Sequence, residues 1–382
     1  MVTNINKLTV GSLTLHRYAD LDYDEWYAIS EFVDNSLHSY LNHKRELNKL
    51  GINKCEVRLS IVTGDNGEEI NVHDNAGGIH STDFERLLSL GIPKEKCETQ
   101  LSEFGMGMKT ASIWFGKKVE IETKHFLEDK AYSITIDIDK LGSDDEVKIS
   151  EVVQSSNIKG YTKIKISKLN RRLSRKKNKI KDSLASIYRK FIENNDLEIN
   201  FEDKTLSPFP IKLLPSSDKS LTRKDFEISL SNGKKCKGWL GIMAKGETRY
   251  SGFSVYRHNR LIQGYPHNSW KPSEVFGREG GTNDLKNQRL IGELDMTAFN
   301  VAHTKNKINF LDDEESEFRK QLGEFCSLIA KEANTTNKSK SVKEHEEKPN
   351  VQLAKEKVKE FFDKPVNTDV KSIDFISPTV KS

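Results

Sequence analysis

The sequence predicts an α+β fold in two domains with a tail, and three observations support this. At 382 residues the chain is too long for one ordinary hydrophobic core. Helical and strand patterns occur in separate runs, which favours antiparallel sheets packed with helices over a doubly wound parallel sheet. Apolar residues become rare after about residue 333, as in a linker. We therefore expect domains at 1–200 and 201–333, followed by a flexible charged tail at 334–382 with a short helix at 351–362.

The first predicted element is a long helix over residues 23–48. Five apolar residues recur at helical spacing and give it one apolar face: Trp26, Ile29, Val33, Leu37 and Tyr40. Two strands follow at 55–62 and 68–73. The sequence Gly64-Asp65-Asn66-Gly67 between them is typical of a β-hairpin turn.

The remaining pattern continues in runs of one type. Strands are expected, in chain order, at 117–124, 131–138, 161–167, 197–202, 225–230, 236–243 and 253–263. The first three of these alternate as in one antiparallel sheet. Helices are expected after Gly107, from about Ser174 to residue 192, and over 312–332. Residues 91–104 are polar and irregular, which suits a lid over a site.

Charge and cysteine content exclude several classes of protein. The 61 basic and 57 acidic residues leave a formal charge of +4, too small to indicate a partner. The cysteines, Cys55, Cys97, Cys236 and Cys326, form no C-x-x-C pair, which argues against zinc and redox motifs. No stretch approaches the roughly 20 apolar residues that span a bilayer. The first ten residues lack a signal-peptide pattern, so we expect a cytoplasmic protein.

Basic residues are concentrated in the segment 168–190. Ten of its residues are Lys or Arg, and its single acid is Asp182. Such a stretch can bind the phosphate backbone of DNA. The segment also fits a solvated helix face whose positive charge is balanced by acidic residues elsewhere on the surface. Both interpretations stay open.

The first chemical motif is Glu31-Phe32-Val33-Asp34-Asn35 on the long helix. Glu31 and Asn35 are four residues apart, so they project from one helical face. A carboxylate there can orient or deprotonate a water, and an amide oxygen one turn away is a hard ligand suited to Mg²⁺. Taken alone, the pair also fits a solvated polar helix face.

The second motif, Asp74-Asn75-Ala76-Gly77-Gly78, follows the end of a predicted strand. The glycines allow a tight turn with room for a ligand against the backbone. Asp74 can accept a hydrogen bond from an exocyclic amine such as that of adenine. An ordinary surface turn with Asn and Gly has the same composition.

The third motif, Gly105-Met106-Gly107-Met108-Lys109, precedes a predicted helix. Glycines leave backbone N–H groups free, a helix N-terminus favours anions, and Lys109 adds positive charge. A flexible loop that enters a helix is the other interpretation. The chain lacks a G-x-x-x-x-G-K-[ST] loop, and this segment lacks the third glycine and the βαβ setting of a dinucleotide fold.

The order of these motifs resembles that of GHKL ATPases, which include gyrase B subunits, heat-shock chaperones, histidine kinases and MutL-type mismatch-repair proteins. MORC-like proteins are the most similar branch. The family has E-x-x-D-N on a helix, D-x-G-x-G after a strand, a lid and a G-x-G-x-K-type loop. Ala76 stands where the family usually has glycine, and alanine fits a turn with negative φ. Thr162 matches the threonine that completes the adenine pocket, although Tyr161 separates it from Gly160.

The resemblance implies a Bergerat-type two-layer α/β sandwich at 1–200 that binds and hydrolyses ATP with Mg²⁺. It implies that Glu31 is the general base, that Asn35 is the Mg²⁺ ligand, and that Asp74 accepts from the adenine amine. The other nucleotide contacts that it implies are Gly78, Ile79, Gly105, Met106, Gly107, Met108, Lys109, Thr110 and Thr162.

The second half resembles the ribosomal-protein-like transducer domain of MORC-like and MutL-like proteins. Residues 252–262 match its strand-turn-strand, and 300–308 match the loop whose lysine reaches the γ-phosphate, with Lys305 the best match and Lys307 the reserve. This implies an ATP-dependent homodimer, a switch or clamp that engages DNA or an effector protein. A role in genome maintenance or antiviral (phage) defence follows by family analogy.

Two other classes fit the same motifs. A non-hydrolysing nucleotide-sensing module would use the pocket to control a protein contact. Glu31 argues against it, because a pure binder needs no base. A heat-shock-type chaperone needs client and dimerisation regions, which we do not expect in a chain of this length.

Overall fold

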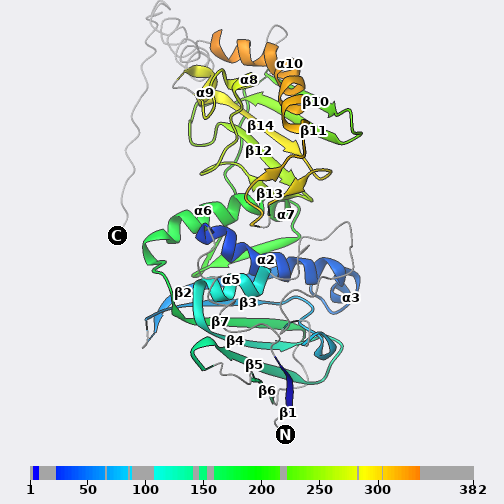
Figure 1. Ribbon diagram of the computed structural model, residues 1–382, viewed down its shortest axis with the longest axis vertical. Coiled ribbons are helices and arrows are strands. Elements are labelled where there is room, and N and C mark those ends of the chain that lie inside the picture. Colours follow the sequence, from blue (N-terminus) through cyan, green and yellow to red (C-terminus); the bar gives the residue numbers. More distant parts are fainter. Residues whose placement is uncertain are drawn as a thin grey trace, which may run out of the picture. The chain divides into compact units, whose positions relative to one another are not determined.

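Two large β-sheets with helices packed against them organise the described part of the chain (Figure 1). The computed structural model describes residues 3–7, 23–64, 67–84, 87, 107–140, 146–152, 159–215, 222–281, 284–302 and 304–335. The predicted lid at 91–104, the site residues Gly105 and Met106, and the tail beyond Thr335 lie outside these residues. The predicted α+β class is confirmed, because helices and mostly antiparallel strands occur in separate runs.

The first sheet has nine strands within the described residues. In spatial order these are β1 (Thr3–Lys7), β6 (Glu146–Val152), β5 (Ala131–Asp137), β4 (Gly116–Lys124), β7 (Tyr161–Leu169), β3 (Gly67–Asp74), β2 (Cys55–Gly64), β8 (Leu197–Phe201) and β9 (Lys204–Thr205). Neighbouring strands are antiparallel, except that β2 and β8 are parallel. The predicted β2–β3 hairpin is confirmed, with Gly64 paired to Gly67 across the turn.

Helices cover one face of this sheet and bury its apolar side. They are α2 (Glu25–Asn42), α3 (Lys44–Lys49), α5 (Gly107–Phe115), α6 (Lys177–Ile187) and α7 (Arg189–Glu193), with short 3₁₀ turns η1 (Ser81–Asp83), η2 (Ile138–Lys140) and η3 (Ser174–Lys176). The five apolar residues predicted on α2 are all buried. The predicted long helix divides at His43, where the backbone leaves helical geometry with φ −114° and ψ 20°.

The second sheet has five strands within the described residues and packs against a long C-terminal helix. In spatial order the strands are β10 (Arg223–Ser229), β11 (Lys235–Ile242), β14 (Leu290–Asp295), β12 (Gly252–Arg257) and β13 (Arg260–Gln263). The remaining elements are α8 (Ser273–Phe276), α9 (Leu285–Arg289), β15 (Asn300–Val301), β16 (Ile308–Asn309) and α10 (Glu314–Thr335). Phe318, Leu322 and Ile329 of α10 are fully buried against this sheet, and α10 corresponds to the helix predicted over 312–332.

Helices of the first sheet also contact the second sheet directly. The Tyr27 hydroxyl on α2 donates to the carbonyl oxygen of Ile262 on β13 at 2.8 Å. The Ser186 hydroxyl on α6 donates to the carbonyl oxygen of Tyr265 at 2.6 Å. Residues Met1–Asn334 accordingly form one compact unit. This places loops of the second half within reach of α2.

Candidate functional site

A cavity of about 220 Å³ lies beside α2 and the end of β3. Eight of the predicted nucleotide contacts line it: Asn35, Asp74, Gly78, Ile79, Gly107, Met108, Lys109 and Thr162. Residues that are separate in sequence therefore come together around one space. Glu31 and Thr110 do not line the cavity. The Thr110 hydroxyl is buried and donates to the carbonyl oxygen of Gly107 at 3.1 Å.

Asp74 is the buried acid at the inner end of the cavity. The Ser36 hydroxyl donates to its Oδ2 at 2.7 Å, and the Ala76 N–H donates to its Oδ1 at 3.0 Å. Burial raises the pKa of Asp74 from 3.8 to about 6, although these hydrogen bonds oppose the rise. The carboxyl is therefore held in place and titrates unusually close to neutral pH.

Thr162 lies directly opposite Asp74 in the β3–β7 register. Its hydroxyl is 3.3 Å from the hydroxyl of Thr123, and Thr123 also accepts from the Ile79 N–H at 2.9 Å. A small polar cluster therefore joins β4, β7 and the turn after β3. Two of its members, Asp74 and Thr162, were predicted, and Ser36 and Thr123 were not.

Gly78 is required by both backbone conformation and space. Its φ is +74°, a region that residues with a side chain rarely adopt, and a Cβ there would lie 1.9 Å from the Lys124 carbonyl oxygen. The neighbouring Ala76 has a negative φ, as the sequence argument required of an alanine at that position. The turn therefore tolerates Ala76 and not a larger residue at Gly78.

Gly107 begins α5 and touches the carboxylate of Glu31. A Cβ on Gly107 would lie 1.9 Å from Glu31 Oε2, so only glycine allows this approach. The N-terminal end of a helix carries partial positive charge, which favours the nearby carboxylate and would favour a phosphate. Met108 and Lys109 continue from this point along the cavity wall.

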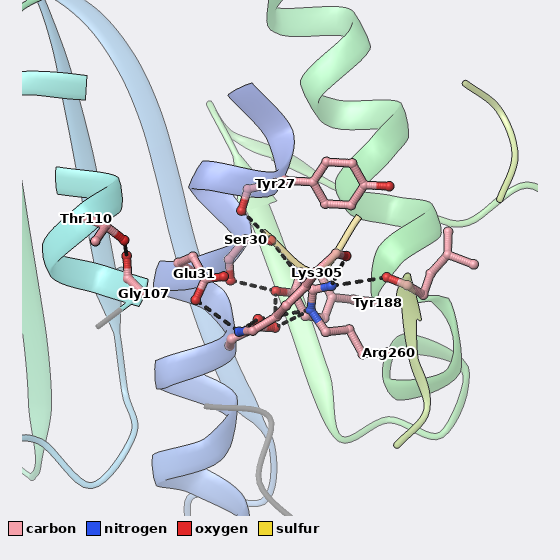
Figure 2. A network of polar contacts seen from close by, with 10 residues as sticks. Tyr27, Ser30, Glu31, Gly107, Thr110, Tyr188, Arg260 and Lys305 are labelled. Atoms are coloured by element: carbon pink, nitrogen blue, oxygen red, sulfur yellow. Dashed lines mark hydrogen bonds and ion pairs between the residues drawn. The ribbon is translucent and has the colours of Figure 1, made fainter. Parts of the chain in front are cut away.

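Glu31 is buried, with an exposed fraction of 3%, and contacts a lysine from the second half of the chain. Lys305 Nζ lies 3.0 Å from Glu31 Oε2 and 2.9 Å from Asp34 Oδ2 (Figure 2). Burial alone would lower the pKa of Lys305, but the charges of Asp34 and Glu31 outweigh it and raise that pKa. The lysine is therefore a charged group held between two acids.

Asp34 is fully buried and has a second cation, Arg260 on β13. Arg260 Nε lies 2.9 Å from each carboxylate oxygen, and the Tyr188 hydroxyl donates to Oδ1 at 2.7 Å. Burial opposes the charged carboxylate, yet Arg260 and Lys305 together hold its pKa below the usual value. Figure 2 shows the side chains of Arg260 and Lys305 converging on α2 from the second half of the chain.

Asp34 lies in the first motif and Arg260 in the segment 252–262, but no role was predicted for either residue, and Tyr188 and Ser30 were not predicted. One signal was present: Ser30 and Asp34 are four residues apart on a helix that packs into the core. An acid on such a face requires a buried cation. The identity of that cation, 226 residues away, could not be read from spacing.

Four histidines that the sequence did not single out also line the cavity: His38, His43, His80 and His125. The rings of His80 and His125 are 4.9 Å apart, and those of His43 and His125 are 5.7 Å apart. Burial lowers the pKa of His125, and the two neighbouring rings lower it further. His125 therefore presents a neutral aromatic surface at neutral pH.

No group of three His, Cys, Asp or Glu residues suited to a metal ion occurs in the described residues. Mg²⁺ often keeps several waters and takes few protein ligands beside substrate phosphates. Asn35, which is partly exposed on the cavity wall, offers one amide oxygen for such a site.

The basic segment 168–190 is largely committed to contacts within the protein. The paired residues are Lys168 with Asp137 and Asp139, Lys176 with Glu25, Lys177 and Lys181 with Glu202, and Arg189 and Lys190 with Glu293. Arg171 and Lys179 lie over the rings of Trp114 and Trp26. Arg172 and Arg175 are exposed. Most of this charge is therefore paired within the protein.

Residues 23–170 match the family model described as histidine kinase-, DNA gyrase B- and HSP90-like ATPases. This segment is therefore a GHKL-type ATPase domain, and it contains every cavity-lining residue predicted above. No curated protein matches the chain. Among the helices of the described residues, none has the length and apolar character needed to cross a membrane.

Proposed function

We propose that the chain is an ATP-hydrolysing switch in which the cavity beside α2 binds ATP and Lys305 senses its terminal phosphate. The family match of residues 23–170 supports ATP binding and a nucleotide-dependent switch. The observation that carries the proposal is the contact between Lys305 Nζ and Glu31 Oε2, which joins residues 274 positions apart. It brings a cation from the second half to the predicted base.

In the proposed complex the adenine lies at the Asp74 end of the cavity. The fixed Asp74 carboxylate accepts from the exocyclic amine, because Ser36 and Ala76 hold its oxygens in place. Thr162 lies opposite it and contributes a hydroxyl. Gly78 and Ile79 line the same end, where the turn after β3 passes close to β4.

The phosphates lie at the N-terminus of α5. Gly107, Met108 and Lys109 line the cavity there, so backbone N–H groups and one ammonium group face the anion. Mg²⁺ would neutralise phosphate charge, with Asn35 as its protein ligand. Gly105 and Met106, which lie outside the described residues, remain predicted contacts.

Glu31 is the proposed general base for the attacking water. The water oxygen bonds to the γ-phosphorus as the bond to the bridging oxygen breaks, ADP leaves with that oxygen, and Glu31 takes the water proton. In this structure Lys305 occupies one carboxylate oxygen of Glu31. The base is therefore engaged until the lysine moves.

The proposed switch is an exchange of partners by Lys305. A terminal phosphate offers more negative charge than one carboxylate, so ATP competes with Glu31 for the lysine and ADP does not. The contact therefore gives the two nucleotide states different affinities for two arrangements of the second half. The exchange of partners by Lys305 would also free Glu31 only when ATP is present.

In this proposal residues 1–200 form the ATP-binding domain, 201–333 the transducer domain and 334–382 a tail. ATP-driven closure of a homodimer, with DNA or an effector protein as the engaged partner, is the output that the family resemblance favours. DNA contact through 168–190 receives less support, because most of its cations already have partners. A role in genome maintenance or phage defence has no residue-level argument of its own.

The direct test compares ATP hydrolysis and nucleotide binding in the wild type and Glu31→Gln. Loss of the base should lower kcat by about 10²–10⁴-fold with binding of a non-hydrolysable ATP analogue retained. Glu46→Gln, an exposed acid-to-amide change on α3, is the matched control and should hydrolyse normally. Equal rates in Glu31→Gln and wild type would remove the base role. Binding without turnover in the wild type would favour the non-hydrolysing sensor.

The dimer is tested by light scattering with a non-hydrolysable ATP analogue. We expect the molar mass to double with the analogue and to remain that of one chain with ADP. Lys305→Ala should weaken the doubling, because the terminal phosphate then has no contact from the second half. A mass that stays that of one chain with the analogue would contradict the clamp.

A further inference from the structure

Arg260 is one of the largest fully buried side chains of the protein, and the proposed reaction gives it no role. Its exposed fraction is 2%, and it lies on β13, next to the turn of two left-handed residues, His258 and Asn259. A buried arginine is costly unless its charge and donors are matched. Its partners therefore indicate what it does.

The Arg260 guanidinium joins three parts of the site. Nε bonds both oxygens of Asp34 at 2.9 Å, and one terminal nitrogen donates to the Ser30 hydroxyl at 2.6 Å. The other terminal nitrogen donates to the carbonyl oxygen of Lys305 at 3.4 Å. One side chain thus holds two successive turns of α2 and the backbone that carries Lys305 (Figure 2).

The Lys305 backbone needs such support. Its φ is +50°, an uncommon conformation for a residue with a side chain. Strained backbone of this kind persists where surrounding contacts over-determine it. The Lys305 N–H also donates to the carbonyl oxygen of Ala302 at 2.8 Å, so its peptide groups are fixed on both sides. The ammonium group can then move by side-chain rotation from a fixed Cα.

The local charges explain why two cations are present. Glu31 and Asp34 supply two negative charges, and Arg260 and Lys305 supply two positive charges. If Lys305 turned to a phosphate with no Arg260 present, Asp34 would be a buried carboxylate without a cation. With Arg260 in place, Asp34 keeps a cation and a hydrogen bond from Tyr188, and only Glu31 loses its pair.

We propose that Arg260 is a positioning residue. Through its contacts with Asp34 and the Lys305 carbonyl oxygen, it confines the partner exchange of the Lys305 ammonium group to Glu31 and the terminal phosphate. This rests on the proposed function, since it needs Lys305 to contact that phosphate. The proposal gives Arg260 no contact with the nucleotide or with the attacking water. The effect of Arg260 is to keep the Asp34 carboxylate paired with a cation, and the Lys305 backbone fixed, in both nucleotide states.

The test is a double-mutant cycle of Arg260→Lys and Lys305→Ala, read out as kcat, KM and the ratio of ATP-analogue to ADP affinity. Arg260→Lys keeps the charge and loses the fork that reaches three partners. We expect kcat and the preference for ATP analogue over ADP to fall about tenfold or more, as for a misplaced catalytic contact. ADP affinity should stay close to that of the wild type. In the Lys305→Ala background the same change should add little.

The matched control is Arg189→Gln. Arg189 is also buried and also links a helix of the first sheet to the second sheet, through Glu293, but it does not contact Lys305. It should lower the melting temperature without changing the ATP preference. If Arg260→Lys does not fold, Tyr188→Phe removes one hydrogen bond from Asp34 and should lower kcat in the same direction.

The outcomes separate the two claims. If Lys305→Ala leaves kcat and ATP preference unchanged, the proposed phosphate sensor fails. If Lys305→Ala lowers both while Arg260→Lys changes only the melting temperature, or adds its full effect on top of Lys305→Ala, the positioning role of Arg260 is overturned and the proposed function stands.

Discussion

The two ends of the candidate site are built in different ways. At the Asp74 end, the polar contacts described above come from α2, the first sheet and the turn after β3. At the Glu31 end, α2 supplies the acids, whereas both cations come from the second half, 226 to 274 residues away. In the proposed function, the first end recognises a ligand by itself, whereas the second acts only while the two halves of the unit are in contact.

The largest effect should come from removing the acid that joins the halves. Asp34→Ala leaves Arg260 and Lys305 as buried cations with too little negative charge, so we expect a loss of about 3–5 kcal/mol in the free energy of unfolding. Denaturant titration measures it. Asp196→Ala, which breaks a partly exposed pair with Lys44, is the control and should cost under about 1 kcal/mol. Similar losses in both would mean that the buried pairing does not stabilise the joint.

At the Asp74 end the sharpest test is steric. Gly78→Ala combines a left-handed backbone with a Cβ that meets the Lys124 carbonyl oxygen, so we expect a loss of at least about 2 kcal/mol. Gly233 has a similar φ of +84°, but a Cβ there would meet no other atom of the described residues. Gly233→Ala therefore measures the backbone contribution alone. Calorimetry of both variants should rank Gly78→Ala as the worse. The reverse order would show that the turn can move away from β4.

The smallest effect is the pH dependence of adenine recognition. Because the pKa of Asp74 is about 6 and an amine donor favours its ionised form, ADP affinity should fall as pH drops through 6. We expect binding about tenfold weaker at pH 5 than at pH 7, before any phosphate contribution.

The sign for stability is the opposite. In the free protein the pKa of Asp74 is higher when the chain is folded, so folding favours the protonated carboxyl. The free energy of unfolding therefore falls as the pH rises from 3.8 to about 6. Asp74→Asn cannot titrate and should retain only the pH dependence that comes from other groups, including the ADP phosphates. Titration calorimetry from pH 5 to 8 measures both proteins, and parallel profiles would remove Asp74 from adenine binding.

Much of the fold was accessible from periodicity. The β2–β3 hairpin and the strands β4, β5 and β7 were predicted because alternation and turn residues are local signals. The edge strand β1 and its neighbour β6 were missed, since β1 pairs with β6 and β6 pairs with β5, so the stability of both depends on the sheet. The division of the long helix at His43 was also missed, because no Gly or Pro marks it.

The sequence by itself determined chemical groups that line the cavity: an acid at a strand end, a glycine at a left-handed position, and a glycine at a helix start. Each is a local requirement, imposed by backbone conformation within a few residues. Only the tertiary structure decided that Lys305 and Arg260 meet on α2, because a buried charge selects its partner by position in space. Spacing along the chain carries no record of that choice. The meeting of Lys305 and Arg260 on α2 is the feature that makes a binding pocket a candidate switch.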